Sequence, residues 1–323
     1  MAYENFIASV EAKKLLEERN KYLCLADHCT REWEGEIKKQ GDSVIVKGFG
    51  RPTIYGLTKD GTYAANAVGT GSIAGKGKDV IHKGIPSPEE LTGYEKKFEV
   101  NQIALFNFLV GDIDEQLSSE KGLIAKTRPK TAQDIAEQQD KRVRDVIIAE
   151  VGCAISGSIN GAAARANGYA LTSGTKDTTS SGANKVNILD AIDEVVLQLR
   201  MNNVKDSEKI FCEVSPKFLR CLKVALRKID TNNSKIVRNR EIVSYNGLEF
   251  IGCNVMQKDS TNDYAFFRTG DSVAFFDPLT KEEAYRPEGG FSDAVKGFNL
   301  YDAGVMDTSA CKYLKIDTAN YEY

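Results

Sequence analysis

The chain has 323 residues, of which 41% are hydrophobic and 28% are charged, a globular composition long enough for two domains and unlike that of a disordered chain. The formal net charge of -3 excludes a broadly basic nucleic-acid-binding protein, because Lys and Arg that neutralise phosphates carry high-affinity duplex binding. No run approaches the roughly 20 apolar residues of a membrane span, and the charged amino terminus is unlike a signal peptide. The seven cysteines are odd in number and scattered, which is typical of buried thiols in a reducing compartment. We therefore expect a protein that is made in a cytoplasm.

The amino-terminal part of the chain alternates between ordered and loop-like sequence. Residues 3–26 predict an amphipathic helical arm whose apolar side chains need a partner surface. Val44 and Val46 alternate with polar neighbours and predict a strand. From Tyr55 to Gly93 there are eight glycines and no helical period, so this segment predicts a long loop, which in a compact domain is usually functional or disordered. The next apolar residues predict a strand or strand pair that enters a core: Phe98, Val100, Ile103, Leu105, Phe106 and Phe108.

Residues Thr131–Ile155 form the longest uninterrupted helical pattern in the sequence. Thr131 and Asp134 have the spacing of a capping box and Pro129 lies just before them, so the helix is predicted to begin at Thr131. An apolar stripe from Val143 onward indicates that the second half packs on a partner layer. The first half is predicted to face solvent or another subunit, because it carries two acid–base pairs at four-residue spacing, Glu137 with Lys141 and Asp140 with Arg144.

The second half of the chain is organised differently, after a small and polar stretch from Asn160 to Asn184. Asn187 is predicted to cap an amphipathic helix, and Ser215 with Pro216 is predicted to begin another. A short apolar strand lies between them. Asn246–Gly247 predicts a type I′ hairpin, and three further strands follow. The sequence therefore predicts an α+β fold.

The residue patterns offer no active site. The glycine-rich stretch that ends near Lys78 departs from a phosphate-binding loop at Thr70 and Gly77. The only histidines are His28 and His82, and neither lies on a predicted rigid element, so a histidine-based hydrolase is disfavoured. A zinc site at Cys24, His28 and Cys29 lacks a second ligand pair. Asp112, Asp114 and Glu115 follow an apolar strand, where a solvated strand end is favoured over a cation site or acid–base chemistry.

Two long stretches are similar to one protein family. The first resembles the amino-terminal region of tailed-bacteriophage major capsid proteins, with a helical arm, an acidic-glycine turn and a strand: FIASVEAKKLLEERNKYLCLADHCTREWEGEIKKQGDSVIVKGFGRPTI. The second resembles the closing strands of that family: SVAFFDPLTKEEAYRPEGGFSDAVKGFNLYDAG. The order of the elements between them also fits. One departure is that no long amino-terminal coiled-coil extension is present, so any scaffold is expected to be another protein.

The resemblance implies the Hong Kong 97-type capsid fold, an α+β architecture with named parts. It assigns residues 1–32 to the N-terminal arm, 33–54 and 94–157 to a peripheral domain with a spine helix at 131–155, 55–93 to an extended loop, 158–259 to an axial domain, and 260–323 to a return into peripheral strands and the C-terminus. The arm and the loop are expected to bury their apolar residues on adjacent subunits.

The resemblance also implies a structural function. The chain is expected to self-assemble into pentamers and hexamers of an icosahedral shell in the virion, around double-stranded DNA to which it lies close without specific binding. Assembly is expected in the cytoplasm of a bacterial host, with portal and scaffolding proteins as partners and no membrane. Two alternatives stay open: the shell of an encapsulin-type bacterial nanocompartment, which shares the fold, and a soluble enzyme.

The capsid interpretation predicts contacts between subunits rather than catalytic, cofactor-binding or metal-binding residues. On the spine helix the candidates are Glu137, Asp140, Lys141, Arg142 and Arg144. Elsewhere they are Lys76 and Lys78 in the extended loop and Asp112 and Asp114 after the apolar strand.

Overall fold

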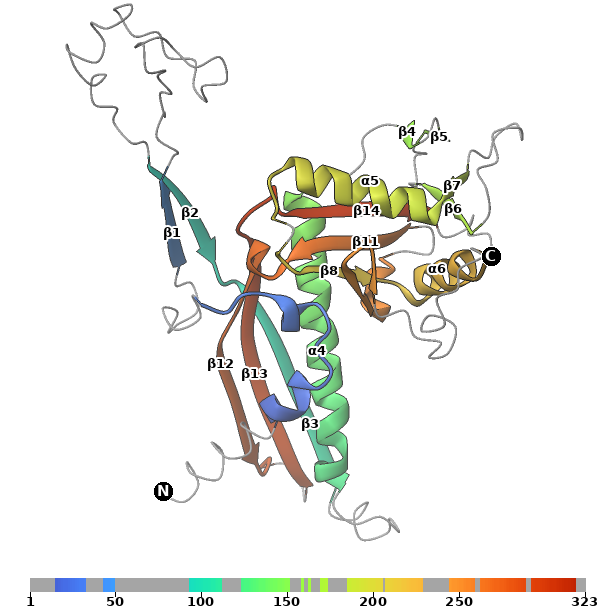
Figure 1. The fold of residues 1–323 in the computed structure, drawn as a ribbon. Helices are drawn as coiled ribbons and strands as arrows, with labels where there is room; N and C mark the ends of the chain where they lie inside the picture. The colour runs from blue at the N-terminus through green and yellow to red at the C-terminus, as the bar shows by residue number, and fades with distance from the viewer. Residues whose placement is uncertain are drawn as a thin grey trace, which may run out of the picture. The chain divides into compact units, whose positions relative to one another are not determined.

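The computed structural model in Figure 1 describes residues 15–32, 43–49, 93–111, 123–151, 158–159, 162–163, 169–173, 185–205, 207–228, 244–258, 262–288 and 292–317. The chain divides into two compact units. The smaller unit is Ser43–Phe98, and the larger unit combines Met1–Asp42 with Glu99–Tyr323. In the part of the chain that the structure describes, no helix is both long enough and apolar enough to cross a membrane.

The smaller unit contains two paired strands. These are β1 (Ser43–Phe49) and β2 (Gly93–Glu99), which form a two-stranded sheet. The strand predicted around Val44 and Val46 is therefore confirmed. Most of the predicted extended loop, residues 55–92, lies outside the described residues.

The larger unit contains a three-stranded antiparallel sheet in the order β12 (Val273–Tyr285), β13 (Ser292–Val305) and β3 (Gln102–Gly111). One long helix, α4 (Leu123–Glu150), packs along β13 and β3 (Figure 1). Gly297 on β13 stands opposite Phe106 on β3. A Cβ atom at Gly297 would lie 2.6 Å from Phe106 Cε1 and 2.8 Å from the Lys281 carbonyl oxygen, so only glycine fits there.

Helix α4 begins eight residues before the predicted start at Thr131 and passes through Pro129. The predicted capping box is wrong: the Thr131 hydroxyl donates to the Thr127 carbonyl oxygen, at 3.3 Å, within the helix. Proline removes one helical hydrogen bond. Packing holds the helix on both sides of it, because Arg128 pairs with Glu282 at 3.3 Å and Ala132 is buried in a cluster with Leu15 and Phe106. At the other end, residues 152–155 of the predicted helix lie outside the described residues.

The second sheet of the larger unit has five strands in the order β14 (Cys311–Asp317), β11 (Asn262–Thr269), β8 (Ile210–Val214), β10 (Leu248–Gly252) and β9 (Ser244–Tyr245). Strands β8 and β10 run parallel, and the other neighbours run antiparallel. The helices α5 (Ile188–Met201) and α6 (Pro216–Lys228) pack in one core with this sheet. Four shorter strands form two small sheets: β4 (Ser158–Ile159) with β5 (Ala162–Ala163), and β6 (Ala170–Thr172) with β7 (Lys185–Asn187).

The predicted helix caps and hairpin are confirmed. The Asn187 side chain accepts a hydrogen bond from the Leu189 N–H at 2.9 Å, and the Ser215 hydroxyl accepts one from the Phe218 N–H at 3.2 Å. Asn246 and Gly247 have φ angles of 50° and 76°, the two positive values that a type I′ turn requires.

Both faces of the five-stranded sheet are covered. On β11, Ala265 and Phe267 join the core with α5 and α6, whereas Tyr264 and Phe266 join a second core with α4 and with residues 23–29. This explains a difference from the sequence interpretation, which placed all of residues 260–323 with the peripheral strands. Strands β12 and β13 lie in the sheet under α4, but β11 and β14 belong to the five-stranded sheet, where apolar side chains on both faces of β11 are buried.

Three short 3₁₀ helices complete the described elements of the larger unit: η1 (Ala26–His28), η3 (Asn254–Met256) and η4 (Gly270–Ser272). Residues 15–20 are also helical.

Candidate subunit-contact site

Three of the predicted contact residues on α4 present charge at its surface. Glu137 and Lys141 form the predicted ion pair, with 2.7 Å between Oε1 and Nζ, and their side chains are 50% and 39% exposed. Arg142 is 36% exposed and donates from Nε to Asp302 Oδ1 on β13 at 2.8 Å. The exposed Glu137–Lys141 pair contributes little to stability, so its charges can exchange partners at low free-energy cost.

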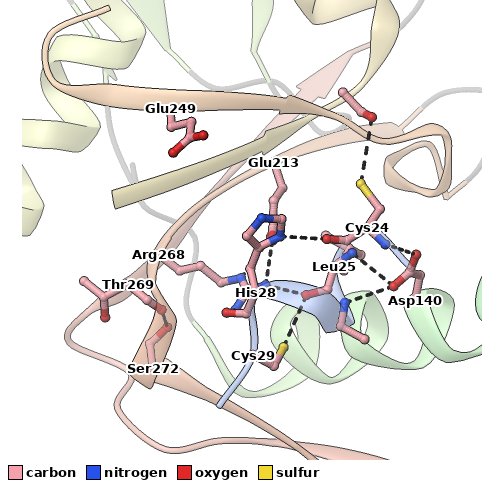
Figure 2. Close-up of polar contacts among 12 residues, drawn as sticks. Cys24, Leu25, His28, Cys29, Asp140, Glu213, Glu249, Arg268, Thr269 and Ser272 are labelled. Atoms are coloured by element: carbon pink, nitrogen blue, oxygen red, sulfur yellow. Dashed lines mark hydrogen bonds and ion pairs between the residues drawn. The ribbon is translucent and has the colours of Figure 1, made fainter. Parts of the chain in front are cut away.

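Asp140 is not at the surface but holds the chain's own amino-terminal segment. Its carboxylate accepts hydrogen bonds from the backbone N–H groups of Cys24, Leu25 and Ala26, each at 3.0 Å (Figure 2). Burial raises the pKa of the Asp140 carboxyl to about 6, while the three N–H donors act in the opposite direction. The sequence interpretation of Asp140 as an outward-facing residue is therefore corrected.

Arg144 is also buried, and the predicted ion pair with Asp140 does not form. The Arg144 guanidinium donates to the Val255 carbonyl oxygen at 2.8 Å and to Asp145 Oδ1 at 3.0 and 3.1 Å. Helical spacing places Asp140 and Arg144 on one face, as expected, but residues 24–26 and the turn after β10 cover that face. Each side chain therefore finds a backbone partner in the covering segment.

A buried ion pair holds the same amino-terminal segment from the five-stranded sheet. Arg268 on β11 and Glu213 on β8 are fully buried and joined by two hydrogen bonds, of 2.9 Å from Nε and 2.6 Å from Nη2. Arg268 also donates to the carbonyl oxygens of Leu25, at 2.7 Å, and His28, at 3.1 Å (Figure 2). The segment therefore lies between a carboxylate on α4, which binds its N–H groups, and a guanidinium on β11, which binds its carbonyl groups.

Residues 24–28, which we call the clasped segment, are followed by a contact with the three-stranded sheet. Thr30 donates its N–H to the Val273 carbonyl oxygen at 2.9 Å and accepts from the Phe275 N–H at 3.0 Å. Leu25 and Ala26 are fully buried in the core beneath α4. The described part of the arm thus buries its apolar residues on its own subunit, contrary to the expectation that they lie on neighbours. Residues 1–14 lie outside the described residues.

Apolar side chains are instead exposed on β3. Alternate residues of this strand, including Phe106, face α4, and the residues between them face outward. The outward apolar side chains are Leu105, Leu109 and Ile103, which are 78%, 62% and 39% exposed. The prediction that Ile103 and Leu105 enter the core is wrong, because they lie on the sheet face that α4 does not cover.

The remaining predicted residues divide into two groups. Lys76, Lys78, Asp112 and Asp114 lie outside the described residues. Among the residues that the structure does describe, no three His, Cys, Asp or Glu side chains converge as metal ligands would.

Sequence reasoning missed two residues that hold the larger unit together, Glu213 and Arg268. The available signal was a charged residue inside each of two apolar strands, IFCEV and YAFFRT. Buried charges in such strands need a partner of opposite sign.

No protein-family model matches the sequence, and no curated protein matches it, but solved structures do. A chain of Mycobacterium phage Che8 is 16% identical, with a TM-score of 0.61 over 90% of both chains. The mature capsid of bacteriophage PhiM1 gives 12% identity and a TM-score of 0.56, over 85% of this chain and 82% of that one. The capsid of Ralstonia phage GP4 is 13% identical, with a TM-score of 0.55 over 90% of this chain and 86% of that one.

These matches cover nearly the whole chain. Because the sequence identities are low, the matches show a shared fold. The chain therefore has the α+β Hong Kong 97-type fold of phage capsid subunits, as the resemblance predicted.

Proposed function

We propose that the chain is a structural subunit that self-assembles into the pentamers and hexamers of the icosahedral capsid of a tailed double-stranded DNA bacteriophage. The observation that carries this proposal is the fold match to phage capsids over most of the chain. Fold alone does not fix function, so the surface of the subunit must also suit assembly.

The outward face of β3 supports self-association. Three large apolar side chains lie in one row on it: Ile103, Leu105 and Leu109. Among the described strands, β3 is an edge strand of its sheet. Apolar rows of this kind are typical of surfaces that a partner covers. The occupant we propose is a second copy of this chain.

The exposed charges on α4 are the second part of the proposed contact surface. Glu137, Lys141 and Arg142 remain candidates, as do Lys76, Lys78, Asp112 and Asp114. Asp140 and Arg144 are set aside, because their polar groups already bind the subunit's own backbone.

The mild net negative charge fits a shell around DNA, since it does not attract phosphates along the inner surface. We infer that the protein assembles in the host cytoplasm and is found in the virion, with portal and scaffolding proteins as partners.

The direct test is expression in bacteria followed by negative-stain imaging. We expect capsomers or closed shells. A discrete monomer or dimer at every salt concentration contradicts the proposal and favours a soluble protein of another function. Shells that contain a protein cargo and no nucleic acid after co-expression with the neighbouring genes favour a nanocompartment instead.

The role of β3 is tested with two matched variants, Leu105→Lys and Met201→Lys. Met201, at the end of α5, is 73% exposed and provides a control for adding charge at an exposed apolar position. Both variants should keep the wild-type melting temperature, because surface substitutions usually change stability by about 0.5 kcal/mol or less. Only Leu105→Lys should lower the yield of shells, by about tenfold or more, since an interface anchor contributes on the order of 1–2 kcal/mol. Equal yields from the two variants exclude β3 from the contact.

A further inference from the structure

A hollow of about 300 Å³ lies beside the clasped amino-terminal segment, within the larger unit. Its lining comes from three places in the sequence: the segment around Cys24, the outer part of α4 at Glu137 and Asp140, and the turn after β10 at Cys253 and Val255. The hollow thus brings together two cysteines that are far apart in sequence.

The two cysteines are neighbours, because Cys24 packs against the buried cluster that contains Cys253. The Cys24 thiol donates to the carbonyl oxygen of Gly252, at 3.8 Å, the residue immediately before Cys253 (Figure 2). Cys253 lines the same hollow as Cys24. Both cysteines are free thiols, and Cys24 is partly exposed whereas Cys253 is buried.

Cys24 differs from the other cysteines that the structure describes. Cys29, Cys212, Cys221, Cys253 and Cys311 are all buried. Cys24 therefore offers a sulfur that a reagent in solvent can reach, and the buried Cys253 lies in the cluster against which Cys24 packs.

We propose that Cys24 and Cys253 are a redox pair, which forms an intrachain disulfide when the protein meets a small-molecule disulfide oxidant such as oxidised glutathione. The bond covalently joins the clasped amino-terminal segment to the turn that follows β10.

The backbones at both ends of this bond are already fixed. The Cys24 N–H is bound by Asp140 Oδ2 at 3.0 Å, and the Cys253 N–H is bound by the Val214 carbonyl oxygen at 2.8 Å. A disulfide forms readily only where the backbone already holds the two sulfur atoms near each other. Oxidation at this site requires the loss of the thiol protons and rotation of the two side chains.

The order of the two chemical steps follows from exposure. The Cys24 thiolate attacks one sulfur of oxidised glutathione, which forms a mixed disulfide and releases one glutathione thiolate. Cys253 then loses its proton to solvent through the hollow and attacks Cys24 Sγ, which releases the second glutathione. In total two protein thiols lose two electrons and two protons, and one glutathione disulfide becomes two glutathione thiols.

The second step should be the slower one. Cys253 is buried, and burial disfavours the thiolate, which is the attacking species in this step. The rate of disulfide closure should therefore increase with pH. In a reducing cytoplasm the pair stays as thiols, and it closes only after exposure to an oxidising medium. This proposal does not depend on the capsid function.

The test is oxidation of the native full-length protein with oxidised glutathione at mildly alkaline pH, followed by alkylation of the remaining thiols and peptide mapping by mass spectrometry. We expect a Cys24–Cys253 crosslinked peptide, a mass loss equal to two hydrogen atoms, and a melting temperature higher by about 5 °C. Dithiothreitol should reverse all three. Alkylation of both cysteines after oxidation, or linkage of Cys24 to a second chain, overturns the proposal.

Three variants separate this chemistry from a general effect of oxidation. Cys24→Ser should abolish both the crosslink and the shift in melting temperature. Cys253→Ser should stop after the first step and retain one glutathione on Cys24. Cys29→Ser is the matched control in the same segment, because its hydroxyl can replace the thiol that donates to Leu25 at 3.4 Å, and it should still form the crosslink. A crosslink that persists in Cys24→Ser contradicts the assignment.

Discussion

At the scale of single residues, the larger unit depends on charges that have no access to water. Glu213 and Arg268 are fully buried, and their pair also binds two carbonyl groups of the amino-terminal segment. An ion pair in such a place need not stabilise the fold relative to apolar residues, but loss of one partner leaves an uncompensated charge.

Arg268→Met is accordingly expected to lower the free energy of unfolding by about 3–5 kcal/mol, because the Glu213 carboxylate remains buried without its partner. Urea unfolding followed by circular dichroism measures this loss. The double variant Glu213→Leu/Arg268→Met should recover part of it, since neither position then carries a buried charge. A double variant that is as unstable as the sum of the two single variants would show that the pair is not coupled.

Asp140 predicts a dependence of stability on pH. Its pKa in the folded protein is about 6, above the ordinary value of 3.8, so the folded state binds the proton more tightly than the unfolded state does. Its contribution to stability is therefore greatest below about pH 4 and decreases as the pH rises through about 6. Between these values the free energy of unfolding of the wild type, relative to Asp140→Asn, should fall by up to roughly 3 kcal/mol.

Urea unfolding at a series of pH values tests this dependence. Asp140→Asn should also be the less stable protein at acid pH, because an amide nitrogen would face the N–H of Cys24 and cannot accept from it. Glu137→Gln is the matched control on the exposed side of the same helix and should follow the wild-type profile. A difference between wild type and Asp140→Asn that is the same at every pH refutes the assignment.

At the scale of elements, α4 illustrates how packing overrides a local signal. Pro129 normally marks a helix start or a break, yet the described helix continues for six residues on its amino-terminal side. The ion pair of Arg128 with Glu282 and the burial of Ala132 hold the turns on either side. The proline is thus tolerated within the helix and is not required for it.

Pro129→Ala should therefore stabilise the subunit. Alanine restores one backbone donor and removes the ring from the preceding turn, which together are worth up to about 3 kcal/mol in a helix interior. The greater freedom of the unfolded chain offsets roughly 0.4–1 kcal/mol of this gain. The midpoint of urea unfolding should rise, and the same substitution at the helix start, Pro216→Ala in α6, should raise it less or lower it. A lower midpoint for Pro129→Ala would indicate that the proline is needed for the geometry of α4.

At the scale of the whole molecule, the division into two units makes the extended loop separable from the rest of the subunit. The Ser43–Phe98 unit is joined to the larger unit through β1 and β2. Changes within the intervening segment should therefore leave both cores of the larger unit intact.

Replacement of residues 58–88 by a short glycine–serine linker tests the role of this loop in assembly. The variant should keep the melting temperature of the larger unit, because the segment belongs to the smaller compact unit, Ser43–Phe98. It should fail to form closed shells if the loop braces neighbouring subunits, as negative-stain imaging would reveal. Normal shells from this variant refute the bracing role, whereas an unfolded subunit refutes the separation of the units.

The parts of this fold that depend on local interactions could be predicted from the sequence. Two helix caps, at Asn187 and Ser215, and the turn at Asn246–Gly247 depend on groups only a few residues apart. Short sequence patterns are therefore enough to predict them. The order of such elements, together with the resemblance at both ends, was enough to predict the α+β capsid fold.

Tertiary structure alone decided which polar residues are buried and which apolar residues are exposed. A helical or strand period places Asp140 with Arg144, and Leu105 with Leu109, on one face, but it does not say what lies against that face. The clasped segment covers the first pair and leaves them bound to backbone groups, whereas the face that carries Leu105 and Leu109 is left open. The physical reason is that burial depends on contacts between segments more than a hundred residues apart, and such contacts leave no local periodic signal.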